Sequence, residues 1–417
     1  MDYHKKAFEV EISNGGPKGY ETAITLKLPA TWAEFHDALQ KARITDGRNC
    51  GIELTRSWWA GLSPELIGNA KNLYELNLFA QRLTMLMAEE LRSLDVLLKM
   101  EQAQNTKAIP LPKLINLTFN TGGHIVPDVF SDETLGAFLY EEDLLSEEAM
   151  RLLDATSTDS EYRRRLLEVF GEHHREETGG AFTNCGYVEP DGDTFKEVYK
   201  PGEMAYFDRS GAPVVLEIVK GLFHDPAYGS GKTMILSLPA TGNTIDQAID
   251  AVGAASVKEC GFRCVECLIP SLRKLIDDAM DEKCSLVPAM EIAGLLKQKQ
   301  RIWNEDAIIK YKALLEASGC SDLQDAICLM EDLDQYELRP EVAQTWGYAE
   351  LVLREKYPDL PEELFQTGQA AEIGRKLLER GNAALTDYGL LRRMDGFPLP
   401  HFDANTPRQE ASGPQFV

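Results

Sequence analysis

Basic residues are scarce in this sequence. It holds 43 Lys and Arg residues against 67 Asp and Glu residues, which gives a formal net charge of −24. A protein that binds nucleic acid directly needs an excess of Lys and Arg to neutralise phosphate groups. The composition therefore argues against nucleic acid as a direct partner.

Long apolar runs and cysteines are also few. The sequence has no run of 18 apolar residues, and no apolar signal segment follows Met1–Ala7. Eight cysteines in 417 residues are typical of reduced thiols rather than of a disulfide framework. Because 44% of the residues are hydrophobic, the chain is expected to fold. We expect a soluble, cytoplasmic protein with no membrane partner.

Signatures of catalytic sites are missing or incomplete. Neither the G-x-S-x-G motif of hydrolases nor the G-x-G-x-x-G motif of dinucleotide-binding folds occurs. The segment Gly229–Thr233 resembles the end of a phosphate-binding loop, but the first glycine of such a loop would fall at Pro226. The residues that follow, Met234–Leu238, have the pattern of a strand rather than the helix that phosphate binding requires. We predict a hairpin turn there.

Two clusters of potential metal ligands have simpler interpretations. Cys260, Cys264 and Cys267 have the C-x3-C-x2-C spacing of iron–sulfur enzymes that use S-adenosylmethionine, but the strand–helix repeats of that fold are absent. Buried thiols are predicted instead, with an iron–sulfur or zinc enzyme as the alternative. His173 and His174 would point about 100° apart on a helix, which indicates a solvated helix end. We predict no catalytic residue, no cofactor and no metal.

Two distant parts of the sequence resemble each other. Ile24–Thr31 recurs as Ile235–Thr241, and Ala181–Val188 recurs as Ala384–Leu390. The spacing of about two hundred residues is far longer than that of a solenoid repeat. It predicts a duplicated unit of more than one small domain.

The pattern of apolar residues predicts an α+β fold. Alternation and β-branching indicate strands such as Thr22–Leu28, Thr233–Leu238 and Ala384–Leu391. Ala181–Val188 and Thr194–Tyr199 are predicted to form a hairpin around Pro190-Asp191-Gly192. The 3–4 spacing indicates helices, one with Thr31 as its N-cap and Trp32, Phe35 and Leu39 on its apolar face, and one with the core stripe Leu73, Leu76, Phe79, Leu83 and Leu86. We expect an elongated multi-domain chain with two copies of a unit, each made of a small α/β module, an acidic helical module and a terminal β-hairpin piece. The predicted boundaries are 1–62, 63–155 and 156–208 for the first copy, 209–285, 286–365 and 366–395 for the second, and 396–417 for a flexible tail.

The negative charge is concentrated in two blocks. Residues 101–150 hold 9 acidic residues against 2 basic ones, and residues 301–350 hold 11 against 4. A solvated surface normally mixes both signs, because like charges repel one another. We predict that the blocks occupy equivalent places in the two copies and bind a partner. The candidate residues are Asp128, Asp132, Glu133, Glu141, Glu142, Asp143, Glu147 and Glu148 in the first block, and Glu316, Asp322, Asp325, Glu331, Asp332, Asp334, Glu337 and Glu341 in the second.

The density of these carboxylates invites comparison with DNA. Twenty helical residues span about 30 Å, so eight carboxylates give one charge per roughly 4 Å. Duplex DNA carries one charge per about 1.7 Å. An imitation of part of a phosphate array is therefore physically reasonable.

Three segments of the first half resemble ArdA-type antirestriction proteins: Tyr74–Leu83, Leu97–Glu101, and Thr183–Val188 with the following Glu197–Tyr199. The resemblance covers residues 5–205 and returns weakly in Pro288–Ala293 and Ala384–Leu390. It implies an acidic, three-domain DNA mimic that occupies the DNA-binding groove of a type I restriction–modification enzyme. Such proteins often form homodimers and are commonly carried by mobile elements. This chain, over twice their usual length, would be a tandem version.

The sequence thus predicts a non-enzymatic antirestriction protein whose acidic blocks stand in for phosphates. Two alternatives remain. The target could be another DNA-binding defence system, such as a CRISPR effector, or the protein could be an acidic adaptor that recruits a basic protein without imitating DNA.

Overall fold

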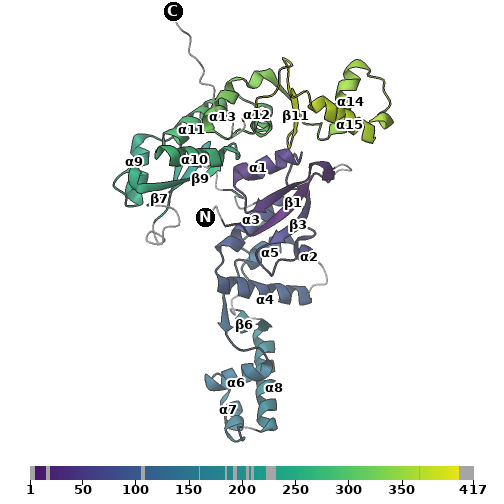
Figure 1. Ribbon diagram of the computed structural model, residues 1–417. Helices are drawn as coiled ribbons and strands as arrows, with labels where there is room; N and C mark the ends of the chain where they lie inside the picture. Colours follow the sequence, from purple (N-terminus) through teal and green to yellow (C-terminus); the bar gives the residue numbers. More distant parts are fainter. Residues whose placement is uncertain are drawn as a thin grey trace, which may run out of the picture. The chain divides into compact units, whose positions relative to one another are not determined.

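The computed structural model describes residues 5–15, 19–104, 109–158, 160–183, 186–190, 195–202, 206–207, 211–221, 232–365 and 367–402. Helices and small antiparallel sheets together give an α+β fold (Figure 1). The chain divides into two compact units. The first comprises Met1–Glu11, Lys27–Pro29 and Gly47–Tyr206, and the second Ile12–Leu26, Ala30–Asp46 and Phe207–Val417. Among the described residues, no helix is long and apolar enough to span a membrane.

The chain begins with a three-stranded sheet of order β2-β1-β3. Its elements are β1 (Phe8–Ser13), the 3-10 helix η1 (Gly19–Thr22), β2 (Ile24–Leu28), α1 (Trp32–Lys41) and β3 (Gly51–Ser57). Helix α1 begins directly after its N-cap Thr31, as predicted. The Thr31 hydroxyl accepts the backbone N–H of Glu34, and the Glu34 carboxylate accepts the N–H of Thr31. This reciprocal capping fixes the start of the helix, and its predicted apolar residues Phe35 and Leu39 are buried.

Helices form most of the first unit. They are α2 (Pro64–Ile67), α3 (Leu73–Met85), α4 (Ala88–Gln104), α5 (Leu111–Leu117), α6 (Asp132–Glu141), α7 (Glu147–Asp154) and α8 (Glu161–Thr178). The apolar stripe predicted as core is confirmed, because Leu73, Leu76 and Phe79 are fully buried. A second sheet, of order β4-β6-β5, consists of β4 (Gly123–Val126), β5 (Ala181–Thr183) and β6 (Gly186–Pro190).

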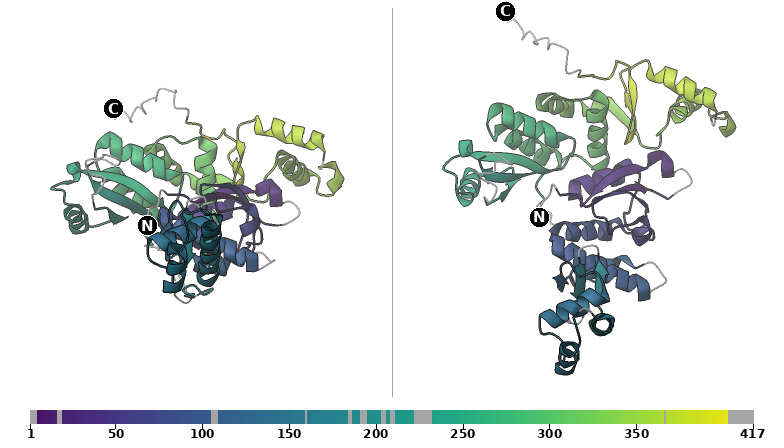
Figure 2. Two further views of the ribbon diagram at one scale, coloured as in Figure 1. Left: turned by 90° about the horizontal axis from the view of Figure 1, so that it is seen from below. Right: turned by 60° about the horizontal axis from the view of Figure 1, so that its bottom comes forward.

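Helices α6 and α8 approach each other closely through glycine. A Cβ atom added to Gly136 would lie 1.9 Å from the carbonyl oxygen of Leu167, and one added to Gly171 would lie 1.9 Å from that of Asp132. No side chain fits at either position, so the two backbones are in direct contact. Figure 2 shows the two helices together from two further directions.

The second unit contains a sheet of order β8-β7-β9 and a sheet of order β10-β12-β11. Its elements are β7 (Val214–Lys220), β8 (Met234–Leu238), α9 (Gly242–Ala251), η2 (Val257–Glu259), β9 (Cys260–Cys267), α10 (Leu272–Lys283), α11 (Val287–Lys299), α12 (Glu305–Ser318), α13 (Leu323–Glu331), η3 (Leu333–Gln335), β10 (Tyr336–Arg339), α14 (Thr345–Lys356), η4 (Glu362–Leu364), α15 (Gly368–Leu378), β11 (Ala383–Thr386) and β12 (Gly389–Arg393).

The closing hairpins of the β4-β6-β5 and β10-β12-β11 sheets have matching details. Thr183 pairs with Gly186 in one hairpin, and Thr386 pairs with Gly389 in the other. Each threonine hydroxyl donates to the carbonyl of its paired glycine, at 2.9 and 2.7 Å. Helices α14 and α15 also meet through a glycine, since a Cβ atom on Gly374 would lie 1.8 Å from the carbonyl oxygen of Thr345.

The prediction of the strands near both hairpins was wrong. The segment 181–188 is not one strand paired with 194–199 but contains β5 and the start of β6, and 195–199 forms no strand. The predicted strand 384–391 likewise folds back on itself as β11 and β12. The two-residue turn Asp387–Tyr388 lacks the Asn-Gly or Asp-Gly signal of tight hairpins. The turn predicted around Pro190-Asp191-Gly192 lies mostly outside the described residues.

The start of the predicted tail is packed rather than free. Of residues 396–417, the structure describes 396–402. Leu399 donates its backbone N–H to the carbonyl of Gly381 at 2.7 Å, and Phe402 donates to that of Ser318 at 3.0 Å. These bonds hold the stretch against the second unit.

Candidate functional site

The first predicted acidic block lies on α6, on α7 and in the segments before and after α6. Ser131 caps α6 by accepting the N–H of Thr134, and Ser146 caps α7 by accepting that of Ala149. Acidic residues follow both caps directly, where they interact favourably with the positive end of the helix dipole. Asp128 and Asp143 adopt left-handed backbone conformations, with φ of 65° and 56°. Asp tolerates this region better than most residues.

Helix α8 neutralises part of this block. Arg175 binds Asp132 through two hydrogen bonds of 2.7 and 3.1 Å, and Arg164 binds Glu133 in the same two-pronged way at 3.0 and 3.2 Å. The bond from Arg164 lowers the pKa of Glu133. On α7, Arg151 pairs with Glu147 at 3.2 Å. The block has no basic residue within it from 128 to 148, yet tertiary and local packing supply arginine to three of its eight carboxylates.

The other five carboxylates form what we call the open acidic set: Asp128, Glu141, Glu142, Asp143 and Glu148. All five are exposed. Within the described parts of the chain none of them has an ion pair or a side-chain hydrogen bond. Their charges therefore face solvent without compensation, which is the condition for binding a cationic partner.

The second predicted block is dispersed over the end of α12, α13, η3 and β10. Glu316 accepts the backbone N–H of Asp387 at 2.8 Å, and burial together with the Asp387 charge raises the pKa of Glu316. Asp322 caps α13 by accepting the N–H of Gln324 at 2.6 Å. Glu337 pairs with Arg339 and Arg392 at 2.6 and 2.8 Å.

The rest of this block is partly engaged. Glu341 lies 4.0 Å from Arg339, and Asp332 accepts the side-chain amide of Gln335 at 2.9 Å. Asp325 is half-buried, whereas Glu331 and Asp334 are exposed. Most of the second block therefore has local partners, and it presents less open charge than the first.

The two blocks lie at different places relative to the neighbouring edge strands. Strands β4 and β10 are the first edge strands of the sheets β4-β6-β5 and β10-β12-β11. The first block follows β4 in the chain, whereas all of the second block except Glu341 lies before or within β10. The elements after β10 are α14, η4 and α15. There Leu360-Pro361-Glu362-Glu363 stands where Leu145-Ser146-Glu147-Glu148 stands after β4. Glu362 and Glu363 are exposed, but they were not among the candidate residues predicted from the sequence. The Leu-x-Glu-Glu motif that both segments share could have identified them.

A group of buried polar side chains in the second unit joins α1, α12 and the β11–β12 turn. The Asp37 carboxylate accepts the Tyr388 hydroxyl at 2.7 Å and pairs with the Lys312 ammonium at 2.7 Å. Lys312 also donates to the Gln40 side chain at 2.9 Å. Burial lowers the pKa of Lys312 and raises that of Tyr388. Perturbed groups of this kind often mark functional sites, but these satisfy one another and act as an anchor for α1.

The remaining candidate motifs have structural surroundings. Cys264 and Cys267 are buried on β9, and Cys260 is partly buried. Among the described residues, no group of His, Cys, Asp and Glu side chains is arranged to hold a metal ion. His173 is exposed, as predicted for a solvated helix end, whereas His174 is half-buried and lies 3.2 Å from Glu189 of β6. Gly229–Gly231 lie outside the described residues, and Met234–Leu238 is the strand that was predicted.

Comparisons with protein-family models, with curated proteins and with solved structures find no match to this chain.

Proposed function

We propose that this protein is a non-enzymatic inhibitor that imitates DNA and occupies the DNA-binding groove of a defence enzyme, with a type I restriction–modification complex as the target. The observation that carries the proposal is the open acidic set, which lies at both ends of α6 and at the start of α7. Five exposed carboxylates have no ion pair with any residue that the structure describes, on a chain with a net charge of −24. Phosphate-binding grooves are lined by Lys and Arg, so such a surface would be attracted to them and would associate rapidly.

Packing of α6 on α8 suits this role because it gives the carboxylates a rigid base. The backbone contacts at Gly136 and Gly171 leave no room for the two helices to slide. The paired Asp132 and Glu133 further tie α6 to α8. A preorganised array of charges loses less entropy on binding than a flexible acidic tail would.

We further propose that the chain is a duplication of one unit. Its second acidic surface differs from the predicted one, because it lies after β10 rather than mostly before it. In support, the sheet orders β2-β1-β3 and β8-β7-β9 correspond, as do β4-β6-β5 and β10-β12-β11. The matching Thr–Gly pairs and the glycine-mediated helix contacts add to this. The second acidic surface would then be centred on Glu362 and Glu363, and a single chain would bind its target at two places.

The test is displacement of DNA from a purified type I restriction–modification complex at two salt concentrations. We expect competition, with apparent affinity falling at least about tenfold between 50 and 200 mM salt, because counterions screen the acidic surface. Failure to displace DNA at low salt would exclude type I restriction–modification complexes as the target. Displacement of DNA from a CRISPR effector would then favour the alternative defence system, and binding of a basic protein without competition by duplex DNA would favour an adaptor.

The matched variants are Glu141→Lys/Glu142→Lys and Asp246→Lys/Asp250→Lys. Both change the net charge equally, and the second pair lies exposed on α9, which belongs to the second unit, whereas Glu141 and Glu142 belong to the first. Asp143 is left unchanged because its left-handed backbone would be strained by Lys. We expect the first variant to inhibit at least tenfold less well and the second to inhibit normally. Equal loss in both would mean that net charge, not this surface, causes inhibition.

A further inference from the structure

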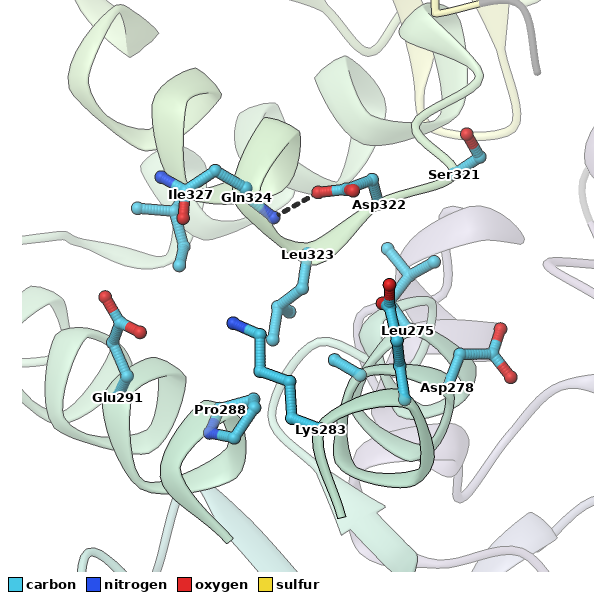
Figure 3. A pocket seen from close by; sticks show the side chains of 12 residues that line it. Leu275, Asp278, Lys283, Pro288, Glu291, Ser321, Asp322, Leu323, Gln324 and Ile327 are labelled. Atoms are coloured by element: carbon cyan, nitrogen blue, oxygen red, sulfur yellow. Dashed lines mark hydrogen bonds between the residues drawn. The ribbon is translucent and has the colours of Figure 1, made fainter. Parts of the chain in front are cut away.

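A groove of about 360 Å³ opens between α10, α11 and α13 of the second unit (Figure 3). Its apolar surface comes from all three helices and includes Leu275, Ala279, Pro288, Leu323 and Ile327. Pro288 and Leu323 are buried, and Leu275 and Ile327 are half-buried. An extended aliphatic chain could therefore lie along the groove and be removed from water.

Four carboxylates and one ammonium group line the same groove. They belong to Asp278, Glu282, Glu291, Asp322 and Lys283. Asp322 is engaged as the cap of α13. In the described residues, Asp278, Glu282, Glu291 and Lys283 have no ion pair or side-chain hydrogen bond. The lining thus keeps an excess of negative charge that faces the groove without compensation.

Lys283 shows what kind of group the groove accepts. Its side chain points into the groove, with Glu291 on one side and Asp278 on the other (Figure 3). An aliphatic stem and a cationic head from the protein itself thus already lie there. Because the head forms no ion pair within 4 Å with any described residue, Lys283 does not neutralise the carboxylates around it.

We infer that this groove binds an arginine or lysine side chain projecting from the basic partner, which makes it a contact separate from the open acidic set. The inference rests on the proposed function for the existence of a basic partner. The stem of the bound side chain would cover Leu275, Leu323 and Ile327, as long cationic side chains commonly do on apolar surfaces. Its head would lie among Asp278, Glu282 and Glu291 and make charge-assisted hydrogen bonds.

The test uses the full chain with labelled Leu and Ile methyl groups and the peptide acetyl-Gly-Arg-Gly-amide as the probe. NMR titration at low salt should give saturable shifts at the methyl groups of Leu323 and Ile327. The same peptide with uncharged citrulline in place of arginine should give none. Absence of saturable shifts with the arginine peptide, or shifts only outside the groove, would overturn the inference.

Four variants sharpen the result. Asp278→Asn/Glu291→Gln should weaken peptide binding roughly three- to tenfold, which is typical of losing two partly exposed charge pairs. Asp246→Asn/Asp250→Asn removes the same charge from α9 and should leave binding unchanged. Lys283→Ala should strengthen binding, because it removes the competing ammonium group. Lys283→Arg should keep binding at the wild-type level. Equal weakening by both carboxylate variants would overturn the inference.

Two further outcomes separate this inference from the proposed function. If the protein displaces DNA from its target but does not bind the peptide, the groove inference fails alone. If it binds the peptide in the groove but displaces no DNA, the proposed function fails and the groove is retained as an arginine site. Spermidine binding in the groove without peptide binding would assign the site to small polyamines and overturn the proposal.

Discussion

Asp37 is a single carboxylate shared by three partners. The Tyr388 hydroxyl and the Lys312 ammonium group each lie 2.7 Å from it, and Lys41 lies 3.8 Å away. The Lys312 side chain is only 4% exposed. Removing Asp37 would leave that charge buried with no counter-charge in contact, which is far more costly than losing a surface ion pair.

We therefore predict that Asp37→Ala lowers the free energy of unfolding by about 3 kcal/mol. The double variant Asp37→Ala/Lys312→Met should lose less than the sum of the two single variants, because it no longer buries an unpaired ammonium group. Urea denaturation of the four proteins gives the coupling energy. Strict additivity would show that the two groups do not depend on each other.

Asp277 on α10 predicts a dependence of stability on pH. Burial raises the pKa of Asp277 to about 6 from 3.8, against the hydrogen bond from the Cys264 N–H and the charge of Arg273. The folded protein therefore holds this proton more tightly than the unfolded chain. The resulting stability is fully present below pH 3.8 and is lost as pH rises through about 6.

Asp277→Asn should accordingly be more stable than the wild type at pH 8, and the difference should shrink at pH 5. The amide oxygen keeps an acceptor for Cys264, so the main change is removal of the charge. Thermal unfolding at the two pH values measures it. A difference that is the same at both would show that Asp277 is not the titrating group.

At the scale of the elements, the α6–α8 contact depends on the absence of two side chains. A methyl group on Gly171 would overlap the backbone of Asp132, and backbone cannot move aside as a side chain can. We predict that Gly171→Ala destabilises the first unit by about 2 kcal/mol or more. Inhibition should fall with it, because the open acidic set loses its base.

The control for this prediction is Gly294→Ala on α11. Nothing lies within 4 Å of a Cβ atom at Gly294. The substitution should therefore stabilise the protein by about 0.5–1 kcal/mol, since alanine favours a helix more than glycine does. Chemical denaturation of both variants distinguishes a packing effect from a general effect of replacing helical glycine. Similar changes in both would refute the close contact at Gly171.

The sequence predicted long elements well and short ones poorly. Helix α1 with its Thr31 cap, the apolar stripe of α3, and strand β8 follow from local patterns that tertiary structure does not override. Terminal hairpin pieces were predicted, but the strands of β5–β6 and β11–β12 were placed wrongly, because strands of three to five residues leave little pattern to read. Strands β4 and β10 owe their existence to pairing with β6 and β12, which no local signal shows.

The same distinction applies to the candidate site. Exposure of Glu141 and Glu142 follows from their position after the apolar face of α6 and could be anticipated. The pairing of Asp132 and Glu133 with Arg175 and Arg164 could not, because those arginines are 31 to 43 residues away in the chain. Which carboxylates remain open is thus decided by tertiary packing, and only the total charge is decided by composition.

At the scale of the whole molecule, the proposed duplication implies that charge changes in both halves affect binding of the target. We predict that Glu147→Lys/Glu148→Lys and Glu362→Lys/Glu363→Lys each weaken DNA displacement, and that the combined variant weakens it by the product of the two factors. The salt dependence of displacement should also become shallower in each. An effect of the first pair alone would mean that only one half contacts the target.

The attachment of α1 to the second unit has a consequence for the newly made chain. Asp37 leaves the ribosome 351 residues before its partner Tyr388. At about 5–20 residues per second, that interval lasts about 20 to 70 seconds. During translation, the carboxylate of Asp37 has neither buried partner until Lys312 and then Tyr388 have been synthesised, so this part of the protein matures only after residue 388. A ribosome stalled before Lys312 would therefore carry α1 without its anchor.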